Sequence, residues 1–165
     1  MPAKVIGKFL NFGFAGTPSR MSDCVIAPYT FPVVAATDGT TIAFGEPVVF
    51  DKTIGGVRKI KTGDTATDVI GFAVRKVSQP HADNVNGWFY EPGDDVDVML
   101  RGSITVGLEA TTGIAARGAV YVDAATGKVY AATASGRLAI GNAFFATGKA
   151  DTEGVAEITL TERVI

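Results

Sequence analysis

The residues of this chain that are suited to catalysis are few, and none forms a known catalytic arrangement. His81 is the only histidine, and it follows Pro80 in a polar stretch without a serine or cysteine in a nucleophile context. The glycine-rich signatures of esterases, nucleotide-binding and dinucleotide-binding proteins, G-x-S-x-G, G-x-x-x-x-G-K-[ST] and G-x-G-x-x-G, are absent. The sequence therefore predicts a protein that is not an enzyme.

The one acidic cluster consists of Asp94, Asp95 and Asp97. With Glu91 these residues would offer carboxylate oxygens to a hard cation such as calcium. The spacing does not match a calcium-binding loop, and carboxylates are common on the solvent side of a strand. We therefore expect a solvated acidic face, with no metal site and no cofactor.

Three adjacent aromatic residues, Trp88, Phe89 and Tyr90, are suited to stacking on a sugar or a base. Adjacent residues of a strand point to opposite faces, however, and no basic residues surround these three. The 15 basic and 17 acidic residues leave a net charge of −2, which argues against a nucleic-acid partner. No apolar run reaches the ~18 to 20 residues of a membrane span, so no membrane partner is expected either.

The element that organises the chain is the stretch 95–109, in which polarity alternates with a period of two. Even-numbered positions from Val96 to Leu108 are apolar or glycine, which predicts a half-buried β-strand. Gly102 is the expected place for a bend or bulge because it has no side chain to pack. Arg101, on the polar face, is suited to an ion pair between subunits or to keeping that face soluble. We take Arg101 and Trp88 as a possible subunit interface.

The second half of the chain repeats the first. Two hairpin patterns, at 47–60 and 119–130, are followed by similar Ile-Gly-x-Ala segments at 69–74 and 139–144. The sequence of the expected C-terminal strand, 155–165, then resembles that of the central strand. Because the landmarks keep the same order, we predict an all-β domain over residues 33–165, a small antiparallel β-barrel or compact sandwich built from two related β units.

Residues 1–32 differ from the rest, because glycines and prolines interrupt both helical and strand periodicity. They predict an extended N-terminal arm with irregular backbone. Its aromatic residues are too many to remain in water, so the arm should dock on its own core, a neighbouring copy or another protein. The candidate contact residues are Phe9, Phe12, Phe14, Arg20 and Tyr29.

Composition also favours assembly. Only 19% of the 165 residues are charged, which leaves little charged surface for a soluble monomer. Cys24 is the single cysteine, so no disulfide within the chain stabilises the fold. We therefore expect part of the surface to be covered by other copies or by a partner.

Four segments, GEPVVFDKTIGGV, VIGFAVRKV, YEPGDDVDVMLRGSITV and GAVYVDAATGKVYAA, together resemble the structural cement or decoration proteins of tailed bacteriophage capsids. The resemblance implies a β-domain that binds the outer surface of an icosahedral head, often as a homotrimer, and bridges subunits of the major capsid protein. It also implies that the arm reaches the shell or an adjacent subunit, and that the protein is made in the host cytoplasm and resides in the virion. The alternatives are another virion structural protein, in the tail or head-joining region, and a small-ligand-binding β-barrel that uses residues 88–97.

Overall fold

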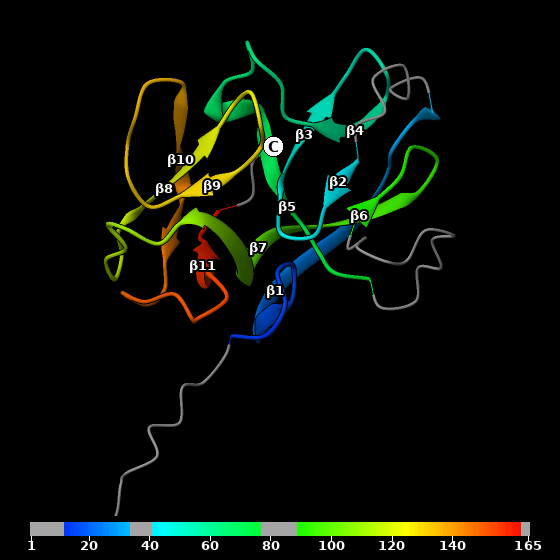
Figure 1. Cartoon of the computed structure of the whole chain (residues 1–165). Helices are drawn as coiled ribbons and strands as arrows, with labels where there is room; N and C mark the ends of the chain where they lie inside the picture. The colour runs from blue at the N-terminus through cyan, green and yellow to red at the C-terminus, as the bar shows by residue number, and fades with distance from the viewer. Residues whose placement is uncertain (1–11, 34–40, 77–88, 163–165) are drawn as a thin grey trace, which may run out of the picture.

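A computed structural model describes residues 12–33, 41–76 and 89–162, which form an all-β structure (Figure 1). Within these ranges the short 3-10 helix Ala66–Asp68 accompanies eleven strands. The strands are β1 (Pro18–Thr30), β2 (Ile42–Ala43), β3 (Pro47–Asp51), β4 (Gly56–Lys59), β5 (Val69–Ala73), β6 (Phe89–Tyr90), β7 (Asp95–Ala110), β8 (Ala119–Asp123), β9 (Val129–Tyr130), β10 (Arg137–Phe145) and β11 (Val155–Leu160).

Five strands close into a barrel. Strand β7 pairs with β11, β11 with β10, β10 with β8 and β8 with β9, all antiparallel, and β9 returns to β7 in a parallel pairing. Closure removes the free sheet edges that an open sheet of this size would expose. Of the two architectures that the sequence left open, the chain therefore adopts the barrel, with further strands attached to it.

The internal repeat appears in the strand pairing. In the first unit β3 pairs with β4 and β5, and β5 pairs with β7. In the second unit β8 pairs with β9 and β10, and β10 pairs with β11. The two predicted hairpins are thus present at corresponding places. The units share β7, which serves as the fourth strand of the first unit and as the closing strand of the second.

Gly102 marks the point where β7 passes from one unit to the other. Before it, Met99 pairs with β5, and from Gly102 onward the strand pairs with β11. Opposite this point β1 bulges, because Arg20 lies across from Ser103 while Val25 lies across from Arg101. Gly102 has φ +115°, and a Cβ there would approach the Cα of Cys24 to 3.0 Å. The predicted irregularity is confirmed.

The hydrophobic core has two parts, one on each side of the shared sheet. Val48 and Val98 belong to the cluster of the first unit, whereas their neighbours Val49 and Met99 belong to the larger cluster of the barrel. Strands β3, β5 and the first half of β7 are therefore covered on both faces. The expectation of a half-buried central strand is wrong in this respect, since its odd-numbered positions Met99, Ser103 and Thr105 are also buried.

The N-terminal stretch is more regular than its prolines predicted. Residues 18–30 form strand β1, which runs antiparallel to β7 along Asp95–Ile104, and Phe31 after it is completely buried. The expectation of irregular backbone is wrong for these residues. Pro18 and Pro28 are tolerated because β1 pairs with β7 on one side only among the described strands. The described part of the arm therefore docks on its own chain.

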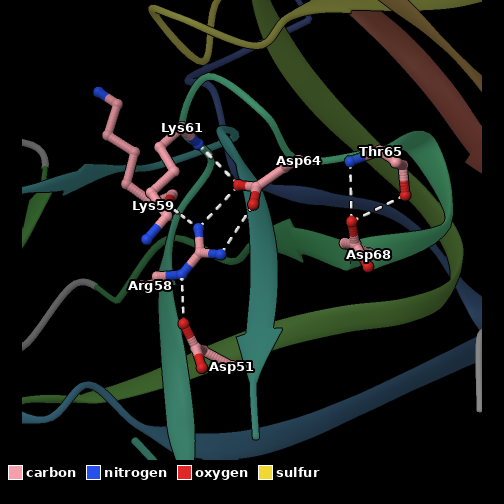
Figure 2. Close-up of polar contacts among 7 residues, drawn as sticks. All are labelled: Asp51, Arg58, Lys59, Lys61, Asp64, Thr65 and Asp68. Atoms are coloured by element: carbon pink, nitrogen blue, oxygen red, sulfur yellow. Dashed lines mark hydrogen bonds and ion pairs between the residues drawn. The ribbon is translucent and has the colours of Figure 1, made fainter. Parts of the chain in front are cut away.

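A half-buried arginine holds the β3–β4 hairpin to the loop that follows it (Figure 2). Arg58 donates from Nε to Asp51 Oδ2 at 2.8 Å and from Nη1 and Nη2 to the two oxygens of Asp64 at 2.7 and 2.8 Å. Hydrogen bonding to Arg58 lowers the pKa of Asp51 to about 2 and also lowers the pKa of Asp64. Both carboxylates are thus ionised near neutral pH and stabilise the hairpin.

Candidate functional site

The start of the described chain is fastened to the barrel by Thr105 of β7. The amide of Gly16 donates to the Thr105 carbonyl at 2.7 Å, and the Thr105 amide donates to the Thr17 carbonyl at 3.0 Å. The buried Thr105 hydroxyl donates to the Phe14 carbonyl at 2.6 Å. A Cβ on Gly16, whose φ is +82°, would approach the amide nitrogen of Arg75 to 2.9 Å, so only glycine fits this close approach. Residues 14–17 therefore form a rigid base.

A second fastening joins β1 to β11. Arg20 donates from Nε to Glu157 Oε1 at 2.9 Å, and the Ser19 hydroxyl donates to the same oxygen at 2.7 Å. The Glu157 side chain is 7% exposed and that of Arg20 is 64% exposed. Burying a carboxylate is costly unless it is paired, so Glu157 depends on these two donors. Arg20, a predicted contact residue, is thus engaged within the chain while one side of it faces solvent.

The aromatic residues of the arm lie in different environments. The Phe12 amide donates to Asp151 Oδ2 at 3.0 Å, which brings the arm to the loop before β11. Phe14 is 57% exposed, and the guanidinium of Arg75 lies 4.3 Å from its ring centroid. Tyr29 is half-buried and meets Phe50 of β3 edge to face, with ring centroids 6.0 Å apart. Phe14 therefore leaves part of its ring open to solvent, whereas Tyr29 packs mainly within its own unit.

Arg101 forms an ion pair within the chain. Its Nη2 lies 2.9 Å from Asp23 Oδ2, and both side chains are exposed. An exposed pair of this kind contributes ~0.2 to 1 kcal/mol to stability. The structure thus brings Arg101 to the β1 bulge. Two other predicted residues, Phe9 and Trp88, lie outside the described residues.

The exposed apolar side chains of β1 were not predicted as contacts. Met21 is 72% exposed, Val25 39% and Ile26 37%. They lie on a strand that pairs on one side only among the described strands, and such a strand offers unpaired amides and carbonyls to another chain. They were not predicted from the sequence, because the prolines of this segment indicated irregular backbone and not a strand. Together with Phe14 they are exposed apolar side chains of the described part of the arm.

The acidic and aromatic residues that the sequence offered as candidates for chemistry have structural roles in the described part of the chain. Asp94 Oδ2 accepts the Glu91 amide at 2.8 Å, and Asp95 Oδ1 accepts the Thr30 hydroxyl at 3.4 Å. Tyr90 is buried and donates to the Val74 carbonyl at 2.6 Å, and desolvation raises its pKa to about 12. Across residues 12–33, 41–76 and 89–162 there is no group of three or more His, Cys, Asp and Glu side chains placed to hold a metal ion.

Two further observations concern function. His81 lies outside the described residues. Within the described part of the chain, no helix has the length and apolar character needed to cross a membrane.

Comparison with known proteins identifies the family. The sequence profile of the phage structural cement proteins, described as "Structural cement protein (E217 gp24/Pam3 gp6)", matches residues 1–161. Among solved structures, a chain of "The capsid of Myoviridae Phage XM1" superimposes with a TM-score of 0.72 at 19% sequence identity, covering 95% of each chain. No curated protein sequence matches significantly. With this profile covering nearly the whole chain, the protein belongs to the structural cement protein family of bacteriophages and is a capsid decoration protein of the virion.

Proposed function

We propose that this cement protein binds the outer surface of an icosahedral phage head and stabilises it by bridging subunits of the major capsid protein. The observation that carries the proposal is the fastening of residues 14–17 to Thr105. A tether transmits load only if its base is rigid, and this base is held by backbone hydrogen bonds to the central strand. The preceding residues then act as the part of the arm that reaches a coat subunit.

The arm of residues 1–32 has two parts in this proposal. Residues 18–30 are docked as β1 and present apolar side chains, while the preceding part carries Phe9 and leads into Phe12 and Phe14. Arg20 and Tyr29 support the docked part. Many modest contacts of this kind, each joining two coat subunits, raise the free energy needed to open the shell through avidity.

The proposal includes a homotrimer, with Arg101 and Trp88 at or near the contact between copies. The low content of charged residues supports assembly of this kind. Light scattering across a dilution series tests it, with a concentration-independent mass of three chains as the expected result. A ring of another fixed symmetry would favour a head-joining or tail component instead. We further propose synthesis in the host cytoplasm and no enzymatic activity.

The arm's role is tested by replacing residues 1–11 with a glycine–serine segment of equal length. This replacement leaves Phe12, the Thr105 fastening and β1 intact, so the domain should unfold at the same temperature as the unmodified protein. Binding to shells of the coat protein encoded in the same phage genome should be lost or strongly weakened. Full-affinity binding by the replaced protein would refute the arm's role. Deleting residues 1–32 is unsuitable, because it removes β1 and the buried Phe31.

A further inference from the structure

A hollow of about 510 Å³ opens between the β1 bulge and the barrel strands β7, β10 and β11. Its volume lies within the ~300 to 1,000 Å³ typical of ligand pockets. Its lining comes from four strands and the turn before β8, and its polar and aromatic groups include Arg20, Ser22, Ser103, Arg117, Phe144 and Thr159. None of the sequence motifs drew attention to it, because its residues are scattered over the chain.

Arg117 is the unusual residue of this hollow. It has φ +61° and is the single non-glycine residue with positive φ in the part of the chain that the structure describes. Its amide donates to the Phe145 carbonyl at 2.8 Å, which holds the turn in place. Glycine adopts this backbone conformation without steric cost, whereas arginine is strained in it. Strain of this kind points to a function for the side chain.

The Arg117 side chain is held at the hollow and has no acidic partner among the described residues. Its guanidinium carbon lies 4.9 Å from the centroid of the Phe144 ring. The other cation of the lining, Arg20, is neutralised by Glu157, and the one lining carboxylate, Asp23, is bound by Arg101. Counted over the described residues, the hollow therefore carries one uncompensated positive charge, from Arg117.

A hydrogen-bond donor is also available inside the hollow. The Ser103 and Thr159 hydroxyls lie 2.9 Å apart and form a hydrogen bond with each other. A hydroxyl pair uses one proton for its own bond, so the second proton remains free to be donated to a ligand. A cation and a neutral donor facing one space match the needs of a single carboxylate group.

We propose that this hollow receives an aspartate or glutamate side chain of the coat protein, with Arg117 as its ion-pair partner. This inference rests on the proposed function and names one contact of the capsid-facing surface. The bulge in β1 contributes to this arrangement, because Ser22 and Asp23 of the bulge line the hollow together with Gly102 and Ser103 of β7. The contact lies on the barrel and is therefore separate from the contact made by residues 1–11.

The test variant is Arg117→Gly in the full chain. Because glycine relieves the positive φ, the variant should unfold at the same or a higher temperature than the unmodified protein. Its affinity for shells of the coat protein from the same phage should fall about tenfold or more, since a charge-assisted pair is lost. The matched control is Arg137→Ala, which removes another arginine stacked on an aromatic ring, Tyr130, at the opposite end of β10. The control should bind as the unmodified protein does.

The outcomes separate the two proposals. Failure of the unmodified protein to bind shells would overturn the proposed function itself. Binding by the unmodified protein with equal affinity of Arg117→Gly would overturn only the carboxylate contact. If the contact exists, binding of the unmodified protein should weaken with added salt more steeply than binding of Arg117→Gly, because screening acts on the lost ion pair. Equal salt dependence of the two proteins would contradict it.

Discussion

Replacing Arg58 with methionine should destabilise the protein in a strongly pH-dependent way. Methionine retains much of the apolar stem but removes the guanidinium that holds Asp51 and Asp64 (Figure 2). The Arg58 side chain is 15% exposed, while Asp51 is 20% and Asp64 9% exposed. In the variant two poorly solvated carboxylates lie close together without a cation, which is an unfavourable arrangement at neutral pH.

The magnitude follows from the pKa of Asp51. Its fall from 3.8 to about 2 corresponds to about 2.4 kcal/mol if taken in full, and solvent screening of this partly exposed carboxylate reduces that to about 1 kcal/mol. The paired hydrogen bonds to Asp64 add a similar amount, about 1 kcal/mol. A total of about 2 kcal/mol lowers the unfolding temperature by about 4 to 8 °C for a domain of this size.

The pH dependence has a definite sign. Both carboxylates have a lower pKa in the folded than in the unfolded protein, so their contribution is complete above about pH 4. The Asp51 contribution is lost as the pH falls toward 2, where this carboxylate becomes protonated even in the folded protein, and the Asp64 contribution declines in the same direction. Denaturant unfolding from pH 7 to pH 2 should therefore show a stability difference between the two proteins that closes below pH 4. Lys52→Met, which removes an exposed charge from the same hairpin, is the control.

A stability difference that stays constant from pH 7 to pH 2 would refute this reasoning. It would mean that Arg58 acts through packing of its stem and not through its ion pairs. A large effect of Lys52→Met would also count against it, since general charge balance and not the Arg58 geometry would then be responsible.

Three further substitutions test the fold around β7. Gly102→Ala should lower the free energy of unfolding, measured with denaturant, by about 2 kcal/mol or more. The reason is that φ +115° is strained for alanine and that the new Cβ would contact Cys24. An unchanged free energy of unfolding would contradict the role of this bend. Thr105→Val should lower the free energy of unfolding by about 1 to 2 kcal/mol, because the hydrogen bond from the Thr105 hydroxyl to the Phe14 carbonyl is lost. It should also speed amide hydrogen exchange at Gly16. Unchanged exchange would show that this hydroxyl does not hold the base of the arm. Tyr90→Phe should lower the stability measured in a thermal melt by about 1 kcal/mol, because the Val74 carbonyl loses the hydroxyl that donates to it. An equally stable variant would mean that water replaces the hydroxyl.

The strands and their pairing within each unit follow from local sequence. Alternating polarity and glycine turns at 47–60 and 119–130 are short-range signals, and each produces the hairpin that it predicts. The repeat of landmarks likewise predicts the repeated pairing of the two units. Such signals depend on residues close together in the chain, so no tertiary information is needed to read them.

Some candidate contact residues could likewise be predicted from the sequence, and others could not. Phe12, Phe14, Arg20 and Tyr29 were chosen because aromatic and basic residues are conspicuous in a proline-rich segment. The apolar side chains of β1 and the Arg117 hollow were missed, because their residues come together only through the bulge opposite Gly102 and the closure of the barrel. No spacing along the chain predicts such a meeting.

By itself, then, the sequence determined an all-β chain of two related units, with no recognisable catalytic motif and an aromatic N-terminal segment. Only the tertiary structure decided that the barrel closes through the parallel pairing of β9 with β7, and that β1 completes the first unit. It also decided that most of the middle of β7 is buried on both faces, because the two cores lie on opposite sides of the sheet that β3, β5 and β7 share. The physical reason is that a polarity pattern reports the local preference for a strand, whereas barrel closure, shared strands and burial of a second face depend on long-range contacts between segments far apart in sequence.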